Sequence, residues 1–155
     1  MVIPSPAQGA ALQYLGMLRT DEMPMLAAHW LIDFDSPALR RLAGLNGSEG
    51  WLIDQLWAAV LIDLGVWELS SEQAWGLAIS YQSAALNAGE RSVTEIMHQV
   101  IRAYIKADYP AHPPEAGDLY GLDDELQCGW GRAPEGVLAD AQRTLTQWAP
   151  RTSPT

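Results

Sequence analysis

SEGWLIDQLWAAVLIDLGVWELSSEQAWG, residues 48–76, holds four of the chain's seven tryptophans. On a helical wheel of residues 51–64, Trp57 lies in the middle of a broad apolar stripe, and only three polar residues interrupt the rest of the surface. A helix that is apolar nearly all round is typical of the centre of a core. We therefore expect a central, buried helix that begins at Ser48 and ends at Gly65.

Helix start and stop signals recur along the rest of the chain. The clearest is a capping box in which Ser92 pairs with Glu95. No segment alternates apolar and polar residues between hairpin turns, and the three prolines within residues 110–114 predict a loop over 108–121. The sequence predicts an all-α fold, a single-domain irregular or orthogonal bundle of about six or seven helices over residues 1–150, with a tail at 151–155. The expected helix starts are Asp21, Ser36, Ser48, Ser70 or Ser71, Ser92 and Pro134.

The tryptophans divide into two groups. Trp57, Trp75 and Trp148 lie on apolar helix stripes, so we expect them in the core. Helical periodicity does not place the other candidates in the core, and exposed tryptophan is enriched at binding hot spots. We therefore predict an interface role for Trp51, Trp67 and Trp130.

The net charge of the chain limits the kinds of partner that we expect it to bind. The chain has 19 acidic and 9 basic residues and a net charge of -10, which disfavours binding to the phosphates of nucleic acids and favours a protein partner with a basic surface. The acidic excess is greatest in residues 108–155. There we predict a docking surface for basic residues, or else a solvated helix start, formed by Glu115, Asp118, Asp123, Asp124 and Glu125.

Composition also bears on the compartment. The single cysteine, Cys128, excludes an internal disulfide, and no stretch is long and apolar enough to span a bilayer or to act as a secretion signal. We expect a cytoplasmic protein that does not bind membranes.

No group of residues predicts catalysis, a metal or a cofactor. Glu95 and His98 have the spacing found in di-iron bundles, but the motif occurs once and both side chains are expected to face solvent. We expect His29 to be a core histidine bonded to a nearby carboxylate. His112, held between prolines, is the best candidate for a functional histidine, although a solvated loop residue is the simpler interpretation.

The order of segments in residues 38–105 is ALRRLAGLNG, then IDQLWAAVLIDLGV, then a Ser-capped helix closing in ALNAGERS before an amphipathic helix. It resembles many small acidic helical proteins of unknown function from high-GC bacteria, some of them similar to immunity proteins of polymorphic toxin systems. The resemblance implies no functional residue. The leading hypothesis is an acidic protein-binding module, possibly an immunity-type protein that neutralises a toxin by covering a basic site.

Two alternatives stay open. The first is a helical enzyme or small-ligand-binding protein with a pocket near His29, Trp30 and Tyr81. The second is a homodimer of structural role, in which exposed apolar residues of two copies pair. A pocket with convergent polar groups would favour the first alternative, and an acidic patch with exposed aromatic residues would favour the protein-binding module.

Overall fold

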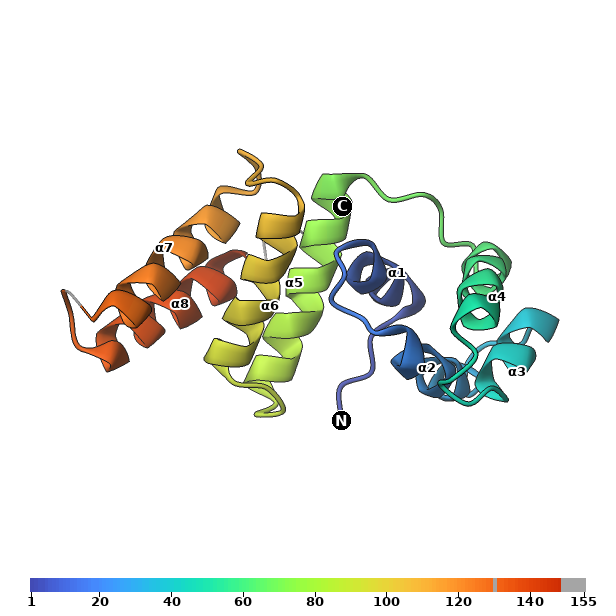
Figure 1. Cartoon of the computed structure of the whole chain (residues 1–155). Coiled ribbons are helices and arrows are strands. Elements are labelled where there is room, and N and C mark those ends of the chain that lie inside the picture. The colour runs from blue at the N-terminus through green and yellow to red at the C-terminus, as the bar shows by residue number, and fades with distance from the viewer. Residues whose placement is uncertain (130, 149–155) are drawn as a thin grey trace. The chain divides into compact units, whose positions relative to one another are not determined.

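The computed structural model describes residues 1–129 and 131–148. These residues form eight α-helices and one short 3₁₀-helix, and no β-strand (Figure 1). The predicted all-α class is confirmed, but the expected number of six or seven helices is wrong. No helix in the described ranges is long and apolar enough to cross a membrane. The predicted tail at 151–155 lies outside the described residues.

The chain divides into two compact units, each with its own core. We call Ile3–Ser70 the N-terminal unit, and Met1–Val2 together with Ser71–Thr155 the C-terminal unit. The arrangement of all helices as one irregular or orthogonal bundle stays a prediction.

The N-terminal unit is built from four α-helices of 7 to 14 residues. They are α1 (Pro6–Tyr14), α2 (Met23–Trp30), α3 (Pro37–Ala43) and α4 (Gly50–Asp63), with the 3₁₀-helix η1 (Thr20–Glu22) before α2. The predicted start of α3 is confirmed, since the Ser36 hydroxyl accepts from the Leu39 N–H and Pro37 takes the first helical position. The predicted cap at Asp21 is wrong: its carboxylate accepts from the Arg19 guanidinium.

Two indoles, tilted by 35° to each other, lie in the core of the N-terminal unit. The ring centroids of Trp30 and Trp57 are 5.3 Å apart, and Trp30 Nε1 donates to the Pro4 carbonyl over 2.8 Å. Trp57 is buried, as predicted. A Cβ at Gly9 in α1 would lie only 2.8 Å from Trp30 Cη2, so this glycine allows α1 to approach the indole pair.

The C-terminal unit is built from four helices of 14 to 17 residues. They are α5 (Ser71–Asn87), α6 (Val93–Lys106), α7 (Pro114–Cys128) and α8 (Pro134–Trp148). Helices α7 and α8, orange to red in Figure 1, pack side by side, and α6 contacts both. The predicted capping box at the start of α6 is confirmed, because Ser92 and Glu95 each accept from the other's backbone N–H.

The core of the C-terminal unit holds a second indole pair. Trp75 in α5 and Trp148 in α8 are buried, as predicted, with ring centroids 5.7 Å apart. The Ser83 hydroxyl donates to the Leu145 carbonyl and joins the same two helices. Val137, Ala141 and Leu145 are buried with Trp148 and complete the inner stripe of α8.

Two helices were not predicted. Residues 108–121 were expected to form a loop, but α7 begins at Pro114, because a proline at the first helical position lacks only an N–H that would be unpaired there anyway. The other is α1, which starts with a capping box between Ser5 and Gln8. Its buried residues are mostly small, so it shows no strong apolar stripe.

Candidate functional site

Helix α4 exposes an apolar face opposite its buried one. Trp51 is 71% exposed and Ile62 is 76% exposed, and Ala58 between them is also exposed. At 100° per residue these three side chains fall on one stripe, about 16 Å long, which also includes the exposed polar side chain of Gln55. The expectation that α4 is buried on all sides is therefore wrong: one face packs in the core and the other is open.

Trp67, in the segment after α4, is the most exposed tryptophan described, at 85%. It lies beyond Gly65, whose positive φ of 71° ends the helix. We call Trp51, Ala58, Ile62 and Trp67 the tryptophan surface. The exposure expected of Trp51 and Trp67 is confirmed, and their interface role stays a prediction. Trp130 lies outside the described residues.

The tryptophan surface lies in a strongly acidic part of the chain. No Lys, Arg or His occurs between Arg41 and Arg91. Of the acidic residues in α4 and the segments next to it, none forms an ion pair within the described residues, and all are exposed; they are Glu49, Asp54, Asp63 and Glu68. Their charges remain available to a partner.

The predicted acidic docking residues lie along α7 in different environments. Asp118 and Asp124 are exposed, and Glu115 is half-buried. The expectation of a free, solvated carboxylate is wrong for Asp123, which is 9% exposed. Ala116, Leu119 and Asp123 form the buried stripe of α7, so the acidic residue occupies a core-facing position.

Glu125 also forms an ion pair within the C-terminal unit. Its carboxylate accepts from the Arg132 guanidinium at 3.1 Å, and Arg132 also pairs with Asp140. The hydrogen bonds from the Arg132 side chain and backbone lower the pKa of Glu125 below its ordinary value. Only Asp118 and Asp124 of the five predicted residues are therefore exposed.

Asp123 forms a small polar network with residues that the sequence did not connect. Its Oδ2 accepts from Gln127 Nε2 over 2.6 Å, and its Oδ1 lies 3.3 Å from His98 Nε2. His98 is expected to face solvent, and its side chain is 48% exposed. A histidine oriented by a buried carboxylate is a common arrangement in general-base catalysis, but the same contact also satisfies a buried aspartate.

The three residues of the predicted ligand pocket are divided between the two units. His29 and Trp30 belong to the N-terminal unit, and Tyr81 belongs to the C-terminal unit. The expectation that His29 is a core histidine is wrong, because His29 is only half-buried and its neighbours Met25 and Ile32 are exposed. The pocket near His29, Trp30 and Tyr81 stays a prediction.

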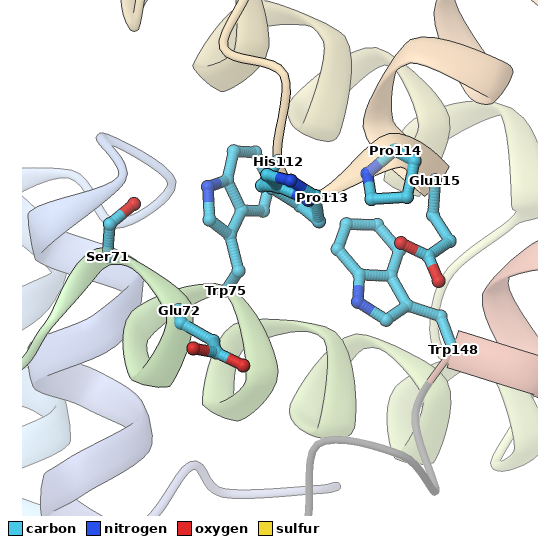
Figure 2. A pocket seen from close by; sticks show the side chains of 8 residues that line it. All are labelled: Ser71, Glu72, Trp75, His112, Pro113, Pro114, Glu115 and Trp148. Carbon is cyan, nitrogen blue, oxygen red and sulfur yellow. The ribbon is translucent and has the colours of Figure 1, made fainter.

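A cavity that the sequence did not predict lies within the C-terminal unit. Its volume is about 620 Å³, and Figure 2 shows its walls, which come from the start of α5, the start of α7 and the end of α8. The lining combines aromatic, proline and acidic side chains: Ser71, Glu72, Trp75, His112, Pro113, Pro114, Glu115 and Trp148. Of these, the sequence singled out His112 as the best candidate for a functional histidine and placed Glu115 in a docking surface.

Within residues 1–129 and 131–148, no three His, Cys, Asp or Glu side chains gather closely enough to hold a metal ion. Cys128 is a free, exposed thiol whose Sγ lies 3.7 Å from Asp124 Oδ1. Comparison with known protein families, with curated proteins and with solved structures found no match for the chain.

Proposed function

We propose that the chain is a protein-binding module whose tryptophan surface docks onto a partner that presents basic residues around an apolar pocket. The observation that carries this proposal is the exposure of Trp51 and Trp67 in the acidic part of the chain. Exposed tryptophan is enriched at the hot spots of protein interfaces. The cytoplasm remains the expected compartment.

The two features of this surface have different roles in binding. The indoles bury large areas without losing much conformational freedom, so they supply affinity and slow dissociation. The unpaired carboxylates of Asp54 and Asp63 attract a basic partner over a distance, so they speed association and make it dependent on salt.

A second copy of the chain suits this surface less well. In a two-fold symmetric dimer the same patch faces itself, so Asp54 and Asp63 of one copy would approach the acidic residues of the other. No lysine, arginine or histidine between Arg41 and Arg91 is present to offset that repulsion.

An immunity-type protein that neutralises a toxin by covering a basic site is the specific form of this function implied by the resemblance. The most acidic surface predicted from the sequence contributes Asp118 and Asp124, which are open carboxylates. Asp123 does not suit a steering role, because its carboxylate is buried and hydrogen-bonded.

The test uses the full chain to isolate a partner from the source cells and then measures binding of the purified pair. We expect Trp51→Ala with Trp67→Ala to weaken Kd by more than about tenfold, mainly through faster dissociation. Asp54→Asn with Asp63→Asn should slow association and reduce its salt dependence. Ile105→Ala is the matched control, since Ile105 is an exposed apolar residue of the C-terminal unit.

Equal affinity of the double tryptophan variant and the unaltered chain would reject the tryptophan surface as the binding site. A stable dimer of the chain alone that dissociates in the same variant would favour the homodimer hypothesis. Light scattering of the purified chain separates these outcomes.

A further inference from the structure

Three tyrosines of the C-terminal unit gather at its surface. Tyr104 belongs to the last turn of α6, Tyr109 to the segment after it, and Tyr120 to the middle of α7. Their ring centroids lie 5.5, 6.1 and 5.8 Å apart in the three pairs, and two of these pairs meet edge to face. We call Tyr104, Tyr109 and Tyr120 the tyrosine cluster.

The backbone around Tyr109 holds its ring in the cluster. Asp108 and Tyr109 have φ values of 60° and 52°, a left-handed conformation that costs energy in residues other than glycine. The Tyr109 N–H donates to the Tyr104 carbonyl over 3.1 Å, so this turn folds back on α6. On α7, Gly117 leaves room for Tyr104, because a Cβ there would lie only 3.2 Å from the Tyr104 hydroxyl oxygen.

The C-terminal unit does not cover these rings fully. Tyr109 is 51% exposed and Tyr120 is 40% exposed. The unit treats another tyrosine differently: Tyr81 is buried, and the guanidinium carbon of Arg91 lies over its ring, 5.8 Å from the centroid. No arginine or lysine of the described residues lies over a ring of the tyrosine cluster in this way. The cluster therefore offers aromatic surface to a group from outside the chain.

The surroundings of the tyrosine cluster are acidic. Residues 104–124 include five acidic residues and a single lysine. Asp124 lies one helical turn after Tyr120 and is exposed, and it forms no ion pair within the described residues. The pKa of the Tyr120 hydroxyl is raised above its ordinary value, chiefly by Tyr109 and also by the carboxylate of Asp124, so this charge acts on the ring.

A ring face beside a carboxylate attracts a cation. The three centroids lie about 3.4 Å from the centre of the triangle that they form, so a cation about 4 Å above this centre would be within about 6 Å of each ring. A guanidinium suits this position better than an ammonium, because it is planar and weakly hydrated and can donate to a carboxylate while it stacks on a ring. Arginine and tyrosine are also both enriched at protein interfaces.

We propose that the tyrosine cluster is a docking site for an arginine side chain of a partner protein, whose guanidinium stacks on the exposed rings and donates to Asp124. This inference concerns the C-terminal unit and does not rest on the proposed role of the tryptophan surface.

Two nearly isosteric probes test the charge preference. N-acetylarginine amide is cationic, and N-acetylcitrulline amide carries a neutral urea group in place of the guanidinium. Binding to the full chain is followed by NMR at constant ionic strength, with the ring signals of the three tyrosines assigned from single variants. We expect the arginine probe to bind at least about threefold more tightly than the citrulline probe. Tetramethylammonium, which has no N–H to donate, should bind more weakly than the arginine probe.

Ring and carboxylate variants locate the site. Tyr109→Leu and Tyr120→Leu should each weaken binding of the arginine probe by about threefold, whereas Tyr120→Phe should preserve it, since phenylalanine keeps the aromatic face. Asp124→Asn should lower the arginine-to-citrulline affinity ratio by about twofold. Tyr14→Leu is the matched control, because Tyr14 is 54% exposed but belongs to the N-terminal unit.

Equal affinity for the arginine and citrulline probes would overturn the proposal, as would an equal loss of binding in Tyr14→Leu and in the cluster variants. Tighter binding of tetramethylammonium than of the arginine probe would overturn arginine as the occupant and favour a free quaternary ammonium ligand. Urea unfolding of each variant accompanies the titrations, and the arginine-to-citrulline affinity ratio within one variant does not depend on its stability.

Discussion

The ring centroids of Trp30 and Trp57 lie 5.3 Å apart in the N-terminal unit, and those of Trp75 and Trp148 lie 5.7 Å apart in the C-terminal unit. Both units thus use a pair of buried indoles in their cores. Their surfaces differ, however. Of the eleven exposed large hydrophobic side chains among the described residues, seven belong to the N-terminal unit: Tyr14, Met25, Ile32, Phe34, Trp51, Ile62 and Trp67.

The C-terminal unit exposes fewer of these large apolar side chains, and it buries a carboxylate. Its helix α6 is amphipathic. The buried carboxylate is that of Asp123, which contacts His98 and accepts a hydrogen bond from Gln127. The comparison teaches that tryptophan content alone does not identify a binding surface. A tryptophan in the stripe of a helix belongs to the core, whereas one on the opposite face of the same helix is available to a partner.

The largest expected effect tests whether the buried and exposed faces of α4 contribute differently to stability. Trp57→Ala should lower the free energy of unfolding by about 3–5 kcal/mol, because it removes a buried indole and leaves a cavity beside Trp30. Trp51→Ala, on the exposed face of the same helix, should change it by less than about 0.5 kcal/mol. Urea unfolding measures both, and similar losses would show that the two faces of α4 are not distinct.

A smaller effect is expected where α1 meets the indole pair. Gly9→Ala should destabilise by about 1–3 kcal/mol, because the added Cβ would lie 2.8 Å from the Trp30 ring. Gly136→Ala in α8 is the matched control: no atom lies within 4 Å of the added Cβ, so the better helix propensity of alanine should stabilise by up to about 1 kcal/mol. Thermal unfolding that ranks Gly9→Ala as neutral or stabilising would contradict the close packing of α1.

The next prediction separates two adjacent carboxylates of α7. Asp123→Ala should cost about 1–3 kcal/mol, because it leaves Gln127 without its buried acceptor and removes the contact with His98. Asp124→Ala, at an exposed position, should cost less than about 0.5 kcal/mol. If the two variants unfold at the same urea concentration, the contacts of Asp123 do not stabilise the fold. The prediction that Asp123 is a docking residue would then stand.

The helical class, the capping box at Ser92 and the core positions of Trp57, Trp75 and Trp148 could be predicted from the sequence because each depends on local signals. Caps act over three or four residues, and a core stripe repeats every helical turn. The start of α7 at Pro114 escaped prediction because its prolines precede the helix rather than interrupt it. The capping box of Ser5 and Gln8 could have revealed α1, since its spacing is a known start signal.

The candidate sites were less predictable, because they join segments far apart in the chain. Helical periodicity showed that Trp51 lies opposite the core stripe, and no local signal placed Trp67 in the core, so both were proposed as partly exposed. No local pattern, however, indicates that residue 123 meets residue 98, or that the starts of α5 and α7 enclose a cavity with the end of α8. Such contacts depend on tertiary packing, which periodicity does not describe.

The smallest expected effect concerns the ion pairs of Arg132 with Glu125 and Asp140, all in the C-terminal unit. Hydrogen bonds from Arg132 lower the pKa of both carboxyl groups from their ordinary values of 4.5 and 3.8. A carboxyl group whose pKa is lower in the folded state stabilises the fold above its unfolded pKa, and this contribution is lost as the pH falls through the folded value. Arg132→Gln should therefore reduce the loss of stability between about pH 6 and about pH 3, while Arg102→Gln, the control, should not. Because these side chains are partly exposed to solvent, we expect a change that is small beside that of Trp57→Ala. Urea midpoints measured across this range would contradict the role of Arg132 if its variant and the unaltered chain lose stability in parallel.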